Sequence, residues 1–347
     1  MLKLNQLIMK AIGCLFIMTA LASCTLIDDD LSECGVDYEM DYELQLVTNM
    51  NTELKTQLST NVNVSSALRT HLSNIFTDFA HDVDLSFYDT EGDSARLQHD
   101  EHIMDANQAS YALFLPMRRY IHLAAANVVD NDMVSVKNDD NCHTAILYQQ
   151  EKDTIDSHTT GVFTARQDMQ ILEGVDQTFN VHLYMANSAT SLIIDPRGHD
   201  YKNIKVYATG FATSFNICDS IYVYSEKSPM VRASQVPVAE GGELCFCTVN
   251  FPSRDTRNTR VIIDSDEPFI SPSADNSLWE YRVYTTLNDG TTTESILYVQ
   301  TPLRAGQLKV IKVHLSDDKG VIESDDATVG VSVTLDWGKI ILPDIPL

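Results

Sequence analysis

Basic residues are scarce in this chain of 347 residues. It carries 24 lysines and arginines against 49 aspartates and glutamates, which gives a formal net charge of −25 at pH 7. Proteins that bind nucleic acid contact the phosphates through clustered lysine and arginine, and anionic lipid surfaces attract polybasic segments. The composition therefore argues against nucleic acid as a partner and against a flat electrostatic contact with a membrane surface.

The familiar catalytic motifs are missing as well. The sequence contains no HExxH, no P-loop, no GxGxxG after an expected strand and no GxSxG. The most metal-like run is His99-Asp100-Glu101-His102, but side chains three apart on a strand point to opposite faces. Acidic loops such as Asp139-Asp140-Asn141 lack EF-hand spacing and are interpreted as turns. We therefore expect no enzyme activity, no catalytic residue, no metal ion and no cofactor.

Cysteine pairs with motif spacing are also lacking. The chain has seven cysteines but no CxxC, so a zinc ribbon or a thioredoxin-type site has no support. An odd number of cysteines follows Cys24, namely Cys34, Cys142, Cys218, Cys245 and Cys247. Disulfides are permitted in exported proteins, but spacing alone assigns no pairing. The default interpretation is that these thiols are buried and pack as small apolar groups.

Long apolar runs are confined to the N-terminus. Lys3 and Lys10 precede a short apolar stretch that ends at Leu21-Ala22-Ser23-Cys24. This order is typical of a secretory signal, whereas a membrane span needs about 20 apolar residues. The ending resembles the bacterial lipobox, in which the cysteine receives a diacylglycerol and becomes the first mature residue. We expect residues 1–23 to be a lipoprotein signal peptide and Cys24 to be lipidated; the alternative is an ordinary signal beside a chance cysteine.

An acidic stretch follows the expected lipidation site. Asp28-Asp29-Asp30 lies within residues 24–33, which we interpret as an acidic tether. Such a run close behind the lipidated cysteine is similar to that of Bacteroidetes lipoproteins exported to the outer face of the outer membrane. The predicted location is therefore the outer membrane, lipid-anchored and exposed on the cell surface.

Strict alternation of apolar and polar residues dominates the rest of the chain. It is clearest over 38–46 and 329–337, and further short candidates are separated by turn-forming clusters. These candidates are 83–88, 111–115, 120–129, 145–148, 181–185, 204–208, 221–224, 244–251, 279–285, 296–299 and 309–315. An apolar stripe from Leu68 to Phe79 predicts one amphipathic helix on the flank of the first sheet. The pattern predicts a mostly all-β protein of antiparallel sandwiches, with domains at 34–176 and 177–347.

Several segments, in their order along the chain, point to a family. Residues 29–34 (Asp-Asp-Leu-Ser-Glu-Cys), 84–89, 159–166 and the closing strand 331–337 together resemble the FimB-like fimbrial anchor subunits of Bacteroidetes. Many relatives have Cys-Pro where this chain has Cys34-Gly35, which leaves the local turn open. The resemblance implies two tandem transthyretin-like antiparallel β-sandwiches, the first with the amphipathic helix. It also implies a non-enzymatic role in type V pili, at the base of a fimbria.

The family joins subunits by exchange of a β-strand, in which an incoming strand fills an open sheet edge. The partners implied are a fimbrial shaft subunit and, through the lipid, the outer membrane. Our candidates for exchange are the inward-pointing residues of two strands, Tyr38, Met40, Tyr42, Leu44 and Leu46, and Val329, Val331, Val333, Leu335 and Trp337. The alternative is that both strands simply complete their own sheets.

Two further points bear on this resemblance. In the family's shaft subunits, a protease cuts after an arginine. The first half of this chain contains five arginines, and the sequence does not indicate which of them would be cut: Arg69, Arg96, Arg118, Arg119 and Arg166. The competing function is a surface glycan-binding lipoprotein, which would present exposed aromatic side chains. Trp279 and Trp337 are the only tryptophans, and both lie in alternating runs that predict core positions. This scarcity disfavours the glycan hypothesis.

Overall fold

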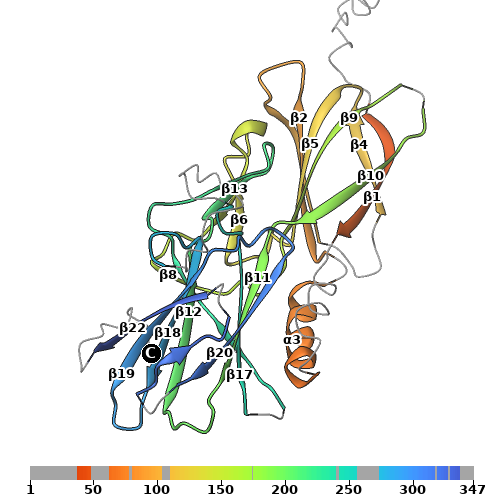
Figure 1. Cartoon of the computed structure of the whole chain (residues 1–347). Helices are drawn as coiled ribbons and strands as arrows, with labels where there is room; N and C mark the ends of the chain where they lie inside the picture. Colours follow the sequence, from red (N-terminus) through yellow and green to blue (C-terminus); the bar gives the residue numbers. More distant parts are fainter. Residues whose placement is uncertain are drawn as a thin grey trace, which may run out of the picture.

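The computed structural model describes residues 37–47, 62–77, 80–103, 110–173, 175–239, 242–255, 273–316, 319–326 and 329–336. The expected signal peptide and acidic tether, with Cys24 and Cys34, lie outside these residues, as does Trp337. Within them the regular structure is mostly β-strand, arranged in four sheets (Figure 1). The predicted all-β fold is therefore confirmed.

Two of the sheets form the upper lobe of Figure 1. The seven-stranded sheet has the order β3 (Arg96–Ile103), β2 (Asp82–Asp89), β5 (Arg119–Ala126), β9 (Phe163–Gln170), β10 (Thr178–Met185), β1 (Asp37–Val47) and β4 (Ser110–Pro116). The four-stranded sheet has the order β14 (Ile221–Val223), β13 (Ser214–Asn216), β7 (Ile146–Gln149) and β6 (Val134–Lys137). Tyr88 and Leu123 of the larger sheet share a buried cluster with Leu147 and Phe215 of the smaller one, so the two sheets form a sandwich.

The other two sheets form the lower lobe. The six-stranded sheet has the order β22 (Val329–Asp336), β19 (Thr292–Val299), β18 (Trp279–Thr286), β12 (Asn203–Thr209), β15 (Met230–Arg232) and β8 (Thr154–Asp156). The five-stranded sheet has the order β16 (Ser234–Val236), β17 (Leu244–Asn250), β11 (Ser188–Asp195), β20 (Leu308–Leu315) and β21 (Ile322–Glu323). Leu192 and Ile194 of β11 join Trp279 and Val283 of β18 in one buried cluster, which is the core of this second sandwich.

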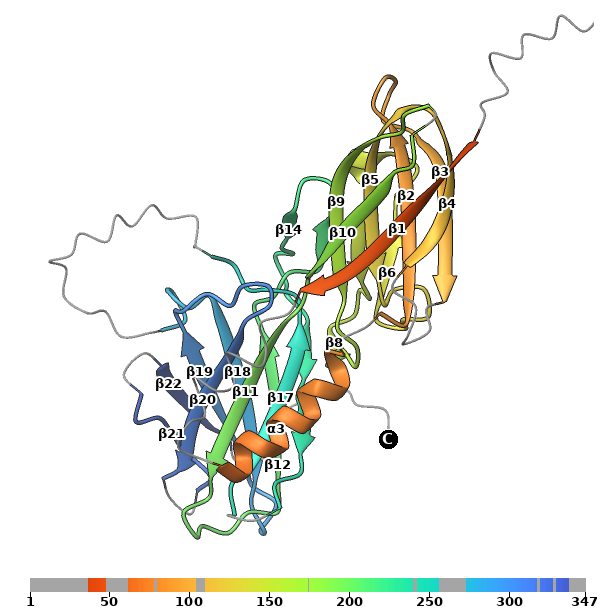
Figure 2. The same ribbon diagram turned by 90° about the vertical axis from the view of Figure 1, so that its right-hand side faces the viewer.

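One α-helix, α3 (Val62–Ile75), occurs in the described residues, and no helix there is long and apolar enough to cross a membrane. Its apolar stripe is buried as predicted, with Leu68 at 0% and Leu72 at 1% exposure. The expectation that it lies on the flank of the first sheet needs correction, because its strand contacts are with β16 and β17 (Figure 2). The stripe identifies the buried face of a helix but carries no information on which sheet covers it.

The helix makes the five-stranded sheet the middle of three layers. Ile193 and Cys247 face the cluster that contains Leu68, whereas Leu192 faces the six-stranded sheet. All residues of β11 except Asp195 are consequently buried. Strands that are covered on both faces lose the alternation of apolar and polar residues, which explains why the sequence did not predict β11.

Three of the four sheets are mixed, not purely antiparallel as expected. β1 runs parallel to β10, β11 runs parallel to β20, and β15 runs parallel to β8. Parallel neighbours need a long crossover connection, and each of these pairs is separated by many residues of intervening structure. The alternation of apolar and polar residues predicts which face of a strand is buried but not the direction of its neighbours. The sequence pattern therefore could not predict the parallel pairs.

Strand pairing crosses the expected domain boundary between residues 176 and 177. β10 follows that boundary but pairs with β1 and β9 of the upper lobe. β8 precedes it but pairs with β15 of the lower lobe. The division of the chain into 34–176 and 177–347 stays a prediction, and these pairings show how closely the two halves are interleaved.

Candidate functional site

The first predicted exchange strand, β1, is internal to its sheet. Asp41–Val47 pairs in parallel with Thr178–Tyr184 of β10, and Asp37–Glu43 pairs antiparallel with Ser110–Pro116 of β4. Figure 2 shows β1 lying between these two neighbours along the upper lobe. Tyr38, Met40, Tyr42, Leu44 and Leu46 are alternate residues of this strand. Removal of β1 would leave two facing edges and therefore a slot for another strand.

The second predicted exchange strand, β22, lies at the edge of the six-stranded sheet. It pairs with β19 along its whole length, from Val299↔Val329 to Thr292↔Asp336, and has no other strand partner among the described residues. Burial of the predicted inward-facing residues fades along the strand. Val329 is 6% exposed, whereas Val333 is 38% exposed. Leu335 belongs to the same strand, and Trp337 lies outside the described residues.

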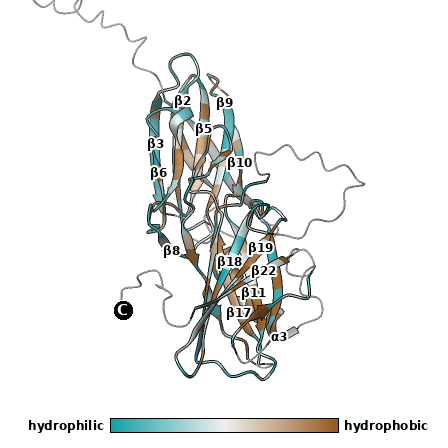
Figure 3. Ribbon diagram, turned by 60° about the vertical axis from the view of Figure 1, so that its left-hand side comes forward, coloured by the Kyte–Doolittle hydropathy of each residue, from teal (hydrophilic) through white to brown (hydrophobic). Residues whose placement is uncertain are grey.

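Exposed strand edges usually carry features that prevent pairing with another chain, such as charges, proline, bulges or short length. β3 has a largely polar sequence and a register shift opposite Phe87/Tyr88, and Figure 3 colours it mainly as hydrophilic. β4 ends in Pro116, and β6 carries Lys137. The remaining edge strands β8, β14, β16 and β21 have three residues or fewer. β22 has eight residues and no charge, proline or described bulge before Asp336.

The two candidate strands belong to different lobes and do not form one site. β1 is a member of the seven-stranded sheet and β22 of the six-stranded sheet. β22 has an open edge that could accept a strand without any rearrangement of the sheet. β1 could be replaced only after leaving its slot, because both of its edges are already paired.

The metal-like run of the sequence lies on the edge strand β3. His99 Nε2 is 2.9 Å from Asp84 Oδ2 of the adjacent β2 and 3.8 Å from Glu101 Oε1. Burial raises the pKa of Asp84, and the hydrogen bond from His99 partly offsets this rise. The sequence missed Asp84 because the antiparallel register that places it opposite Glu101 is not visible in the local pattern.

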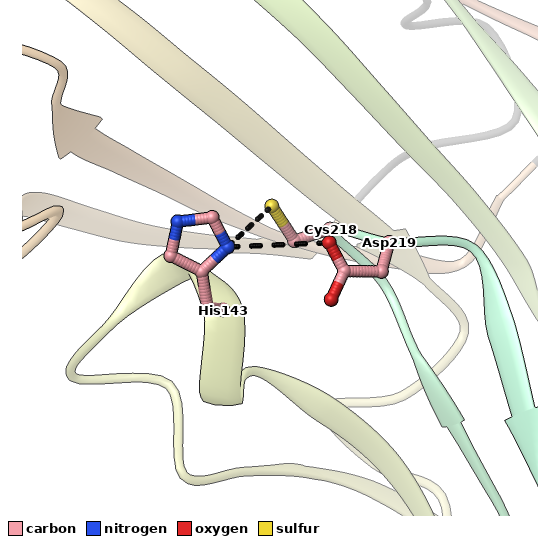
Figure 4. Close-up of side chains that lie close together, drawn as sticks. All are labelled: His143, Cys218 and Asp219. Atoms are coloured by element: carbon pink, nitrogen blue, oxygen red, sulfur yellow. Dashed lines mark hydrogen bonds and ion pairs between the residues drawn. The ribbon is translucent and has the colours of Figure 1, made fainter.

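A second cluster involves residues that the sequence treated separately. His143 Nδ1 lies 3.9 Å from Cys218 Sγ and 4.0 Å from Asp219 Oδ1 (Figure 4). Cys142, next to His143 in the sequence, has its Sγ atom 2.6 Å from Cys218 Sγ. Burial, followed by the neighbouring Cys218, raises the pKa of Cys142 to about 12. Only the pairing of β7 with β13 reveals this proximity, since the two cysteines are 76 positions apart.

The described tryptophan is a core residue, as its alternating run predicted. Trp279 is 1% exposed, and its indole Nε1 donates a hydrogen bond to the carbonyl oxygen of Thr301 at 2.9 Å. Its ring lies against Phe211 and Tyr281. Trp279 is therefore unavailable for stacking on a sugar ring.

In the part of the chain that the structure describes, these features define a two-lobed β-sandwich protein in which β22 has an unprotected edge and β1 is paired on both sides. The sequence matches no protein-family model and no curated protein. Among solved structures, the chain is similar to a candidate adhesin from Bacteroides ovatus, with a TM-score of 0.47 and 9% identity over 87% of this chain and 97% of that one.

Two further solved structures are similar to the chain. A candidate polysaccharide-binding protein from Bacteroides thetaiotaomicron has a TM-score of 0.47 and 8% identity over 84% of this chain and 97% of that one. The fimbrial anchor protein Mfa2 from Porphyromonas gingivalis has a TM-score of 0.43 and 9% identity over 86% of this chain and 99% of that one.

Proposed function

We propose that the chain is a membrane-tethered anchor or minor structural subunit of a type V fimbria, which holds the shaft by β-strand exchange. The observation that carries this proposal is the outer edge of β22, eight residues long and without the usual protecting features. A donated strand of the shaft subunit would pair with this edge through its backbone. Each backbone hydrogen bond contributes about 0.5–1.5 kcal/mol net, so a full ladder on eight residues supports a stable attachment.

The distribution of arginines supports the anchoring role. The first arginine of the chain is Arg69, so none occurs in the expected tether, in β1 or in residues 48–61 that connect β1 to α3. Arg69 itself is a residue of α3. An arginine-specific protease that acts on extended segments would therefore leave β1 joined to Cys24. A tethered subunit needs this continuity, because loss of β1 would separate the folded lobes from the lipid.

The competing hypothesis is a glycan-binding surface lipoprotein. An aromatic platform is its usual requirement, and Trp279 is buried in the lower core. A glycan-binding function would not explain the unprotected edge of β22 or the absence of arginine before Arg69. Strand exchange is therefore the better supported function.

Charged substitutions on the open edge test the proposal. Ser332 and Thr334 are exposed residues of β22, and lysine at an edge discourages the addition of a strand. We expect Ser332→Lys/Thr334→Lys to release fibres from cells into the medium while the melting temperature stays nearly unchanged. Unchanged retention of fibres by the correctly folded variant would contradict the proposal.

A matched control places the same charges on exposed positions of the other lobe. Asn180 and His182 are exposed residues of β10, which lies between β9 and β1. Asn180→Lys/His182→Lys adds the same number of lysines in a different sheet from β22. We expect this variant to retain fibres as the unmodified protein does, and equal shedding by both variants would point to a general effect of charge.

A further inference from the structure

We propose that Cys142 and Cys218 form a disulfide bond in the exported protein. The two thiols are unbonded in the structure, with 2.6 Å between their Sγ atoms. That separation is closer to the length of a disulfide, about 2.05 Å, than to ordinary non-bonded contacts, which lie at about 3.5–4.0 Å between carbon atoms. The two cysteines therefore occupy positions at which a bond can form with little movement.

The backbone fixes this arrangement from both sides. Cys142 begins the short 3-10 helix η1 (Cys142–Thr144) that leads into β7, and Cys218 follows β13. β7 and β13 are paired, and beyond the pair Ile217 N donates to Ala145 O at 3.1 Å. The side chain of Asn216 also donates to His143 O at 2.7 Å. These bonds hold the two segments together independently of the sulfur atoms.

Other roles for the two thiols fit the geometry less well. Two thiolates on one tetrahedral zinc ion, each with a Zn–S bond of about 2.3 Å, would lie roughly 3.8 Å apart, which is wider than this pair. Cys245 and Cys247 offer a comparison within the same chain. They are alternate residues of β17, and Cys245 Sγ faces Ser191 Oγ at 3.4 Å, not another cysteine. Those two thiols act as small apolar core groups.

Cys218 is the thiol that an external oxidant would reach first. It is 6% exposed, whereas Cys142 is fully buried at 0%. His143 Nδ1, at 3.9 Å from Cys218 Sγ, is placed to accept the thiol proton. The side chain of His143 is 60% exposed and so can pass that proton to water.

The reaction is a thiol–disulfide exchange with an oxidoreductase disulfide outside the cytosol. The Cys218 thiolate attacks that disulfide, forms a mixed disulfide and displaces one oxidoreductase thiolate. The Cys142 thiolate then attacks the Cys218 sulfur and displaces the second. One disulfide is formed and one is reduced to a dithiol, and the two protons lost by the cysteines end on the oxidoreductase thiols.

The bond would close a long loop that passes through both lobes. The residues between Cys142 and Cys218 include β9 and β10 of the upper lobe and β11 and β12 of the lower lobe. Closing a loop of this length restricts the unfolded chain strongly. For a protein of this size the loss of the bond would lower the melting temperature on the order of 10 °C.

Peptide mapping of the full chain tests the proposal directly. The chain is expressed with its N-terminal segment in a bacterium that exports lipoproteins, denatured in iodoacetamide without reductant, digested and analysed by mass spectrometry. We expect a peptide of Cys142 linked to a peptide of Cys218, lighter by two hydrogen atoms than the two reduced peptides, and alkylated Cys245 and Cys247. Full alkylation of Cys142 and Cys218, persisting after treatment of the folded protein with oxidised glutathione, would overturn the proposal.

Melting curves give a second readout that separates a bond from ordinary packing. We expect Cys142→Ser, Cys218→Ser and the double variant to lose similar amounts of thermal stability, since each removes the same bond. Reductant should lower the melting temperature of the unmodified chain but not that of these three variants. Cys245→Ser is the control, because it removes a buried thiol but keeps the bond, so reductant should lower its melting temperature by as much as that of the unmodified chain. Additive losses for the two single variants, with no effect of reductant on the unmodified chain, would also overturn the proposal.

Discussion

Gly161 is packed directly against Phe76 at the end of α3. A Cβ atom on residue 161 would lie 2.6 Å from Phe76 Cδ1, closer than side-chain atoms approach one another. The amide of Gly161 also donates to the carbonyl oxygen of Ile75 at 2.8 Å. This contact joins the helix that covers the lower lobe to the segment that leads into β9 of the upper lobe. A glycine is required because any side chain would displace the helix end.

Gly161→Ala is therefore expected to destabilise the protein. The added methyl group must move Phe76, which is 5% exposed and part of the core that α3 shares with both lobes. Overpacking of this kind costs about 1–3 kcal/mol. Urea unfolding should show the loss as a lower midpoint. Gly92→Ala is the matched control, because a Cβ there meets Asp89 at an ordinary 3.5 Å and the change should be nearly neutral.

A double variant identifies Phe76 as the source of the strain. Phe76→Leu removes part of the ring that a Cβ on residue 161 would strike. If the clash is with this ring, the double variant Gly161→Ala/Phe76→Leu should lose less free energy of unfolding than the sum of the two single losses. Strict additivity would show that the strain arises elsewhere in the segment.

His158 ties the two lobes together through a buried hydrogen-bond network. Its ring nitrogens lie 2.8 Å from Asn187 Nδ2 and 3.0 Å from Gln149 Oε1, and its backbone amide donates to Val249 O at 2.9 Å. The bond from Asn187 requires Nδ1 to be an acceptor, so the neutral ring with its proton on Nε2 satisfies both partners. Burial lowers the pKa of His158 to about 4, which agrees with a neutral ring.

This lowered pKa predicts acid sensitivity. Between about pH 4 and pH 6.5 the unfolded chain binds a proton on this histidine that the folded chain does not, so the free energy of unfolding falls as the pH is lowered. The loss is about 3 kcal/mol across that range and stops below about pH 4. Burial also lowers the pKa of His122, which stacks on Phe87, to about 4, so that residue should add a similar loss.

Chemical unfolding at pH 7 and pH 5 measures this effect. We expect His158→Gln, which cannot titrate in this range, to reduce the difference between the two pH values by roughly 2 kcal/mol. The variant is also expected to be less stable at pH 7, so the pH dependence and not the absolute stability is the diagnostic quantity. An unchanged difference in the folded variant would show that His158 contributes nothing to the acid sensitivity.

The sequence of the N-terminal segment predicts where the mature chain begins and that the chain stays attached to the membrane. We expect the surface protein to begin at Cys24 and to keep β1, because no arginine precedes Arg69. Cys24→Ala should move the protein from the membrane fraction to the medium, since each buried acyl CH₂ contributes about 0.8 kcal/mol to membrane binding. Peptide mapping and fractionation check these outcomes. A mature chain that begins at or beyond Thr70 would contradict them.

Strands with one covered face were predictable from the sequence, whereas strands in other environments were found only in part. The alternation in 181–185 and 279–285 located β10 and β18, whose burial alternates over much of their length. The prediction at 83–88 also located β2, although β2 is buried on both faces. β11 was missed because both of its faces are covered, and β3 because it is a polar edge. The slot around β1 and the pairing of Cys142 with Cys218 depend on contacts between distant segments, which no local pattern encodes.

Photo-crosslinking from the edge of β22 tests the central claim most directly. A photoreactive amino acid replaces Ser332, and the same residue replaces Asn180 on β10 of the other lobe as the control. On illuminated cells the account predicts a crosslink from position 332 to a polymeric β-rich surface protein, and none from position 180. No protein adduct at position 332, or equal adducts at both positions, would contradict it.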